Sequence, residues 1–137
     1  MALNASLTVE GREYNILDLD YRLTQPTDTK GKPSGITTGG LINFTVNASK
    51  QDDFFFHEWV TSLSTVKSGR FTLPITDGIE HLETYVYFED AYCTDLQVTY
   101  GNLNERQVYM RITISATVLA FGAAGTVEYH NQNLETK

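Results

Sequence analysis

The segment ERQVYMRITISATVLAF, residues 105–121, contains the longest regular pattern in the chain and decides the fold. Strict alternation of this kind predicts a β-strand. Its residues, at about 3.3 Å each, span about 56 Å, whereas a domain of this length has a radius of gyration of about 14 Å. The strand must therefore curl around a barrel or project from the domain. One predicted face holds Val108, Met110, Ile112, Ile114, Ala116, Val118 and Ala120, and the other holds Tyr109, Arg111, Thr113, Ser115, Thr117, Leu119 and Phe121.

The segments on both sides of this strand complete a β-rich C-terminal half. Residues 101–104 (GNLN) predict a hairpin loop, and an aromatic strand precedes them over residues 82–100. We expect that strand to be interrupted near Glu89-Asp90. The alternation stops after the long strand, and residues 122–137 are predicted to form a polar tail.

The N-terminal part of the chain predicts a bulged hairpin. Residues 3–9 alternate as a half-buried strand does, and Gly11-Arg12 suits a type II′ turn. The apolar pattern then slips by one residue between Ile16 and Leu17. A β-bulge produces such a slip, and bulges bend sheets in the way that a barrel requires.

One helix is predicted, from Ser49 to Val66, with Asp52 and Asp53 stabilising its N-terminus. Phe54 falls on the polar side of this helix and is left without a place in the core. The apolar stripe at helical spacing consists of Phe55, Phe56, Trp59, Val60, Leu63 and Val66.

Shorter alternating strands flank the helix at residues 42–48 and 71–75, and Pro74 in the second indicates a sheet edge. The whole pattern predicts a single domain, residues 1–137, of mainly β class. We expect a bulged antiparallel β-barrel of two packed sheets with a single α-helix at about residues 50–66.

A long polar loop is predicted at residues 24–40 (TQPTDTKGKPSGITTGG), which contain two prolines and four glycines. Structureless loops beyond about 12–15 residues are uncommon in compact domains and are usually functional or disordered. This loop, the leftover Phe54 and the edges of the long strand are all features suited to interaction with another chain.

The composition argues against several classes of protein. The chain has 10 Lys and Arg against 17 Asp and Glu, a net charge of -7, which does not suit binding to nucleic acid or an anionic membrane. A single cysteine excludes an intramolecular disulfide. No apolar run approaches the ~18–20 residues of a transmembrane helix, and residues 1–6 do not resemble a secretory signal. We expect an acidic, soluble protein in a reducing compartment, without membrane insertion.

Few residues offer catalytic chemistry. The three histidines lack metal-ligand spacing, and Cys93 lacks a nucleophile signature, so that it is predicted to be a partly buried strand residue. Asp18 and Asp20 share the strand face opposite the apolar side chains, and we expect them to face water. We predict no catalytic, metal-binding or cofactor-binding site and no enzyme activity.

An ordered set of features over most of the chain resembles the tube protein of bacterial type VI secretion systems, the Hcp-type family, and especially its short, β-rich members. The features are the hairpin at residues 7–14, the DTKGKP loop at 28–33 followed by Gly39-Gly40 and a strand, the helix after residues 47–49, the KSG entry to the next strand at 67–69, and the final strand closing on residues 115–117.

This resemblance implies a barrel that assembles as a hexameric ring, with rings stacked into a tube that a contractile sheath drives out of the cell. The implied partners are other copies of the chain, the sheath, a spike protein and effector proteins. The implied localisation is assembly in the cytoplasm followed by secretion through the apparatus. Polar strand positions such as Thr113, Ser115 and Thr117 could line the lumen. The proposed ring-interface residues are Asp28, Lys30, Gly31, Lys32, Pro33, Ser34, Gly35 and Phe54.

Two alternatives stay open. One is a lipocalin-like barrel that binds a small molecule, with the aromatic residues 85–92 lining its cavity. The other is the tail-tube protein of a phage-like injection particle, which would share the fold and the ring. A native mass near six subunits would favour a ring, whereas a monomer with a bound small molecule would favour the ligand-binding barrel.

Overall fold

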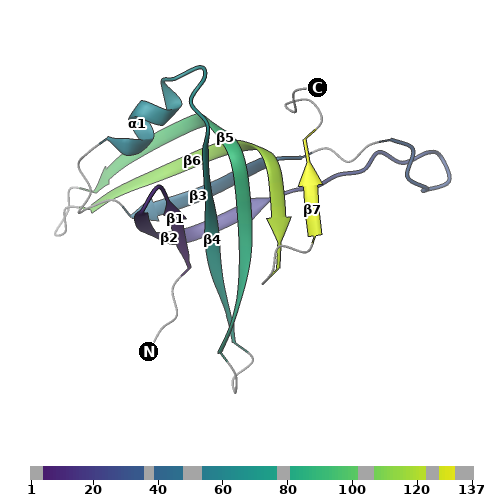
Figure 1. Cartoon of the computed structure of the whole chain (residues 1–137), viewed down its shortest axis with the longest axis horizontal. Coiled ribbons are helices and arrows are strands. Elements are labelled where there is room, and N and C mark those ends of the chain that lie inside the picture. The colour runs from purple at the N-terminus through teal and green to yellow at the C-terminus, as the bar shows by residue number, and fades with distance from the viewer. Residues whose placement is uncertain are drawn as a thin grey trace.

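The computed structural model describes residues 5–35, 39–47, 54–76, 81–101, 107–122 and 127–131, and these form seven β-strands and one short helix (Figure 1). The elements are β1 (Ser6–Val9), β2 (Arg12–Tyr21), β3 (Leu41–Asn47), α1 (Phe55–Val60), β4 (Lys67–Thr76), β5 (His81–Gly101), β6 (Gln107–Phe121) and β7 (Val127–His130).

Six of the strands close into an antiparallel barrel. The sheet runs in the order β3-β2-β1-β4-β5-β6-β7, and a further pairing between β3 and β6 closes it. β7 pairs with β6 alongside the closed part, over Val118–Phe121. The predicted bulged antiparallel barrel with a single helix is therefore confirmed, and its two layers are parts of one continuous sheet.

The first hairpin turns one residue earlier than predicted. Val9 pairs with Arg12, so the turn residues are Glu10 and Gly11 rather than Gly11 and Arg12. Both have positive φ, 49° and 76°, which is typical of a type I′ turn and not of type II′. The type I′ twist matches that of the flanking strands, and this favours it despite a non-glycine first residue.

The predicted bulge in β2 is confirmed. The register against β3 shifts between Ile16 and Asp18, so Leu17 is the extra residue. Leu17 is exposed, whereas the side chains of Tyr14 and Ile16 before it are buried. After the bulge Leu19 packs against the core, as the phase slip in the sequence indicates.

β5 is continuous where an interruption was predicted, but it bends there. Asp90 has a φ of 49°, and its N–H donates to Ser68 Oγ at 3.1 Å. Thr117 of β6, opposite it, donates from Oγ1 to the Asp90 carbonyl at 2.9 Å. Phe88 and Ala91 are both buried although they are three residues apart, so β5 changes face at this point.

The same change of face occurs in β6 and corrects the predicted alternation. Ala116 and Leu119 are both fully buried, whereas strict alternation assigned them to opposite faces. Residues 108–116 follow the prediction, and the residues after Thr117 do not. The paired bend in β5 and β6 is the physical reason, because both strands turn together around the barrel.

The helix is shorter than predicted. It ends at Val60, and Leu63, assigned to the apolar stripe, is 99% exposed. Side-chain bonds to the backbone end it: Thr61 Oγ1 donates to the His57 carbonyl at 2.8 Å, and Ser62 Oγ accepts from the N–H of Thr65 at 3.0 Å. Such local bonds compete with helical ones. The predicted N-terminal turn at residues 49–53 lies outside the described residues.

Aromatic side chains fill the barrel and the space under α1. Phe44 lies edge-on to Phe71 at 5.0 Å and to Phe56 of the helix at 6.2 Å. Trp59 is buried, and its Nε1 donates to the Ala91 carbonyl at 3.1 Å. The helix thus closes one end of the barrel, and its position is fixed by a directional hydrogen bond as well as by apolar contact.

The C-terminal region differs from the polar tail of the sequence prediction. Residues 127–130 form β7, which is antiparallel to the end of β6. Tyr129 is buried on this strand, and so is Asn131 just after it. A single buried aromatic residue in a four-residue strand gives no alternation, so the sequence pattern was too short to predict β7.

Candidate functional site

The arm, which we define as residues 22–35 between β2 and β3, extends far beyond the barrel (Figure 1). It contains seven of the eight predicted interface residues. The loop is an antiparallel pair of extended segments rather than an irregular connection. They are joined by the bridge between Thr27 and Pro33, by the Asp28 N–H donating to the Lys32 carbonyl at 2.8 Å, and by the Ser34 N–H donating to the Pro26 carbonyl at 2.8 Å.

Asp28 organises the tip of the arm. Its Oδ1 accepts from the backbone N–H of Lys30 at 2.8 Å and of Lys32 at 3.0 Å. Its carbonyl accepts from the N–H of Gly31 at 3.1 Å, and Gly31 has a φ of 87°, which favours glycine. The tip therefore presents two lysines on a turn with a defined shape.

Every residue of the arm is exposed. Its shape therefore depends on the local hydrogen bonds described above, because no apolar burial holds it. Each such bond contributes only about 0.5–1.5 kcal/mol. A segment that keeps one conformation without burial is preorganised for contact with another molecule, since binding then costs less conformational entropy.

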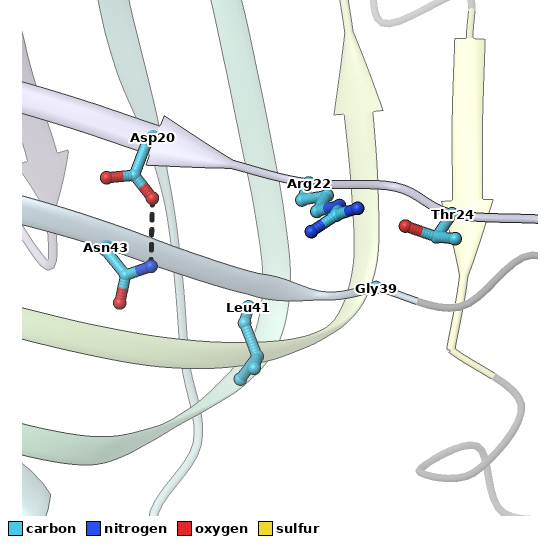
Figure 2. Close-up of a pocket in the computed structure, with 6 residues that line it drawn as sticks. All are labelled: Asp20, Arg22, Thr24, Gly39, Leu41 and Asn43. Carbon is cyan, nitrogen blue, oxygen red and sulfur yellow. Dashed lines mark hydrogen bonds between the residues drawn. The ribbon is translucent and has the colours of Figure 1, made fainter.

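The base of the arm is a narrow neck. A Cβ at Gly39 would lie 2.7 Å from Leu23 Cδ2 and 2.8 Å from the Arg22 carbonyl oxygen, so the two sides pass too close for a side chain there. An open pocket of about 420 Å³ lies beside this neck (Figure 2). It is lined by Asp20, Arg22, Thr24, Gly39, Leu41 and Asn43.

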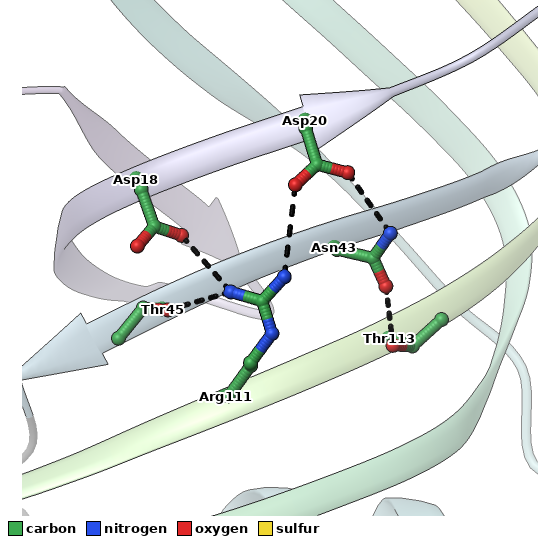
Figure 3. Close-up of polar contacts among 6 residues, drawn as sticks. All are labelled: Asp18, Asp20, Asn43, Thr45, Arg111 and Thr113. Carbon is green, nitrogen blue, oxygen red and sulfur yellow. Dashed lines mark hydrogen bonds and ion pairs between the residues drawn. The ribbon is translucent and has the colours of Figure 1, made fainter.

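A hydrogen-bonded polar face covers the outside of β2, β3 and β6 (Figure 3). Arg111 reaches across β3 to Asp18 at 3.5 Å and to Asp20 at 3.7 Å. Asn43 links the strands by donating to Asp20 at 3.0 Å and by accepting from Thr113 Oγ1 at 2.6 Å. Asp18 and Asp20 are exposed, as predicted.

These ion pairs contribute little to stability. The side chains of Arg111, Asp18 and Asp20 are about half exposed or more, and exposed ion pairs typically contribute about 0–1 kcal/mol. Their main effect is to make a continuous strand surface polar, and Arg111 offsets one of the two negative charges of Asp18 and Asp20. Such a surface can stay in contact with water when the rest of the protein is covered.

Phe54, the eighth predicted interface residue, lies at the other end of the barrel. It precedes α1 at the end of the chain segment that follows β3, whereas the arm precedes β3. Phe54 is 60% exposed and has a φ of 57°, a conformation that is costly for a bulky residue. The structure does not bring Phe54 and the arm together within one copy.

The arm is basic although the chain is acidic. The arm has a net charge of +2, from Arg22, Lys30 and Lys32 against Asp28. Because the net charge of the whole chain is -7, the rest of the chain has a net charge of -9. A basic projection on an acidic body is electrostatically complementary to the body of another copy.

Burial raises the pKa of two side chains that could otherwise take part in catalysis, Cys93 and Tyr14. Burial raises the pKa of Cys93 to about 11, so the thiol is protonated at neutral pH, and the residue is buried on its strand as predicted. Burial also raises the pKa of Tyr14, and the nearby Arg12 opposes that rise. Within the described ranges no group of three or more His, Cys, Asp or Glu side chains could hold a metal ion, and no helix is long and apolar enough to cross a membrane.

The aromatic residues 85–92 would line a ligand cavity if the barrel were lipocalin-like, but Tyr85 and Tyr87 point away from the barrel core. Val86 and Phe88 face the core, and Phe88 packs against Phe71 at 5.5 Å. Tyr85 and Tyr87 are half-buried on the other face, and the Arg70 guanidinium lies 5.2 Å from the Tyr85 ring. Core side chains therefore occupy the interior that a lipocalin-like ligand would need.

These observations define a class: a closed antiparallel β-barrel that is filled by its own aromatic side chains and carries an exposed, hydrogen-bonded arm. The family model for the hemolysin coregulated protein Hcp (TssD) matches residues 1–132. The chain belongs to this family, which comprises type VI secretion tube proteins and is not a family of enzymes.

Solved structures agree with this assignment. Hcp1 from Flavobacterium johnsoniae is 30% identical, with a TM-score of 0.77 over 94% of this chain and 100% of that chain. An Hcp protein is 17% identical, with a TM-score of 0.71 over 94% and 99%. A type VI secretion system effector from Yersinia pestis, at 15% identity and a TM-score of 0.67 over 93% and 99%, shows the same fold. No curated protein matches the sequence.

Proposed function

We propose that the protein forms hexameric rings that stack into the inner tube of a type VI secretion apparatus, which a contractile sheath propels out of the cell to deliver effectors. Assembly would take place in the cytoplasm, and the tube, with a spike protein and effectors, would leave through the apparatus. The observation that carries the proposal is the arm, which is ordered, fully exposed and basic on an acidic barrel.

The arm supports contact between copies in two ways. Its hydrogen bonds fix its shape before contact, so that little entropy is lost on binding. Its lysines at the tip can pair with the carboxylates of a neighbouring subunit or ring, since the body of each copy has an excess of acidic groups. A head-to-tail contact that closes on itself generates a ring.

The polar face on β2, β3 and β6 supports a water-filled lumen. Thr113, one of the predicted lumen residues, belongs to its network, and Ser115 follows it on the same face of β6. Thr117 serves a different purpose, because its hydroxyl holds the bend at Asp90. Because Arg111 offsets only one of the two aspartates, this network would give the lumen wall a net charge of -1 per copy.

The test is a charge reversal at the tip of the arm. The Lys30→Glu, Lys32→Glu double variant keeps the backbone bonds that shape the arm, and it should fold with unchanged stability. Native mass measurement and electron microscopy should show that it assembles poorly, whereas the wild type should have about six times the 15.4 kDa mass of one chain and form stacks. Arg70→Glu, on the outside of the barrel, is a matched control. Unchanged rings and unchanged stacks in the double variant would remove the arm from assembly.

A further inference from the structure

β7 lies on the same edge of β6 as β3, directly in line with it. β3 pairs with residues 109–115 of β6, and β7 pairs with residues 118–121. Two bonds fill the interval between them: Ala116 N–H donates to the Gly40 carbonyl, and Asn131 N–H donates to the Thr117 carbonyl, both at 2.8 Å. The end of β7 therefore meets the chain where it returns from the arm, as Figure 1 also shows.

Two buried side chains of this region press on the returning chain. Tyr129 is 8% exposed and Asn131 is 7% exposed. A Cβ at Gly40 would lie 2.9 Å from Asn131 Nδ2 and 3.6 Å from Tyr129 Cε2, and Gly40 has a φ of 94°. Only glycine fits this contact. Burial raises the pKa of Tyr129, and a hydrogen bond with the Gly39 backbone opposes that rise.

The first side of the arm, where the chain leaves β2, is held by an aromatic contact with the end of β6. Tyr21, the last residue of β2, stacks on Phe121 at the end of β6 with a ring-centroid distance of 5.3 Å. β7 pairs with that same end of β6, through Phe121 and Val127. Both sides of the arm are thus anchored to the β6–β7 hairpin, while the arm beyond them has no burial of its own.

We propose that β7 is a clasp that sets the direction of the arm, with Tyr129 and Asn131 as positioning residues that hold Gly39 and Gly40. The clasp rests on the proposed function, because its purpose is to aim the arm at another copy. A hairpin that is anchored only at its base moves as a lever, so a small displacement at Gly40 becomes a large one at Lys30 and Lys32. The C-terminal strand therefore controls assembly although it need not touch the neighbouring copy.

The first experiment removes one oxygen atom. Tyr129→Phe keeps the buried ring and loses the bond to Gly39, and Tyr100→Phe, an exposed tyrosine on β5, is the matched control. Hydrogen exchange of the arm amides in the full-length chain should become about fivefold faster in Tyr129→Phe, which corresponds to one lost hydrogen bond. Tryptic cleavage after Lys30 should accelerate similarly, and stacking should weaken. Barrel amides and the control should be unchanged.

Gly40→Ala tests the clasp from the other side, since its methyl group would displace Asn131 and Tyr129. It should accelerate exchange in both the arm and β7. Equal arm exchange in Tyr129→Phe and Tyr100→Phe would overturn the clasp, whatever the state of assembly. A wild-type chain that stays monomeric would instead overturn the proposed function, and the exchange comparison would still decide whether β7 holds the arm.

Discussion

The helix end of the barrel and the arm are held in opposite ways. At the helix end Phe55, Phe56 and Trp59 are buried. Two cations lie close to the Phe55 ring, with the Arg12 guanidinium at 4.9 Å and the Lys67 ammonium at 4.8 Å from its centroid. The arm has no buried residue and depends on its own hydrogen bonds. The barrel should therefore fold without the arm, and changes in the arm should have little effect on the stability of the barrel.

Truncation of Trp59, which holds the helix on the barrel, should cause the largest loss of stability. Trp59→Ala removes a buried ring and its bond to the Ala91 carbonyl, and should lower the free energy of unfolding by about 3–5 kcal/mol. Denaturant unfolding followed by circular dichroism measures this change. Phe54→Ala, next to the helix but exposed, is the control and should cost less than about 0.5 kcal/mol. A loss below about 1 kcal/mol for Trp59→Ala would show that the helix does not close the barrel.

A second prediction concerns pH and the barrel interior. Burial raises the pKa of Cys93 to about 11 from 9.0, so the unfolded chain loses the thiol proton first as the pH rises. The stabilising contribution is complete below pH 9 and falls between pH 9 and 11, by on the order of 2 kcal/mol. Unfolding experiments on the wild type and Cys93→Ala should show a shallower decline in the variant over this range. Equal slopes would contradict burial of the thiol.

A glycine-to-alanine substitution should affect global stability in the barrel but not in the arm. A Cβ at Gly69 would lie 2.4 Å from the Thr8 carbonyl oxygen and 2.9 Å from Phe88 Cζ, so Gly69→Ala should destabilise the barrel by about 1–3 kcal/mol. Gly31→Ala meets open space, and its cost of about 1–2 kcal/mol for a positive φ falls on the arm alone. Global unfolding should detect the first and not the second. Equal losses in global stability would mean that arm and barrel unfold together.

Asp28→Ala should have the smallest effect on stability and a clear effect on assembly. It removes the acceptor for the N–H groups of Lys30 and Lys32, both exposed to water, so the free energy of unfolding should change by less than about 0.5 kcal/mol. The arm should lose its shape, and native mass measurement should show fewer assembled particles. Asp18→Ala, on the polar face, is a charge-matched control. Normal assembly of Asp28→Ala would mean that contact does not need a preorganised tip.

Much of the barrel could be predicted from sequence because its signals are local. The alternation over residues 108–116 and the phase slip at Leu17 each reflect the two-residue period of a half-buried strand. One failure arises where distant segments meet, and the other arises from local side-chain bonds. The change of face in β6 depends on Asp90 across the sheet, and the helix ends early because Thr61 and Ser62 bond to the backbone.

The sequence predicts the arm as a loop but does not predict the hydrogen bonds within it. Only the structure shows that the Asp28 carboxylate gathers two backbone N–H groups, and that β7 presses on Gly40. A single buried Tyr129 between exposed neighbours gives no periodic signal. The ion pairs and hydrogen bonds around Arg111 could not be predicted from the sequence either, because the residues that form them come from three strands.

The central claim is that the barrel folds alone and the arm assembles it. A variant in which residues 27–33 are replaced by Asn-Gly, a two-residue hairpin turn, keeps the bond from the Ser34 N–H to the Pro26 carbonyl and removes the tip. Its unfolding and its particle size by native mass measurement and electron microscopy should be compared with those of the wild type. We predict an unfolding free energy within about 0.5 kcal/mol of the wild type together with loss of ring stacking. Wild-type rings and stacks without the tip, or a barrel that no longer folds, would contradict the claim.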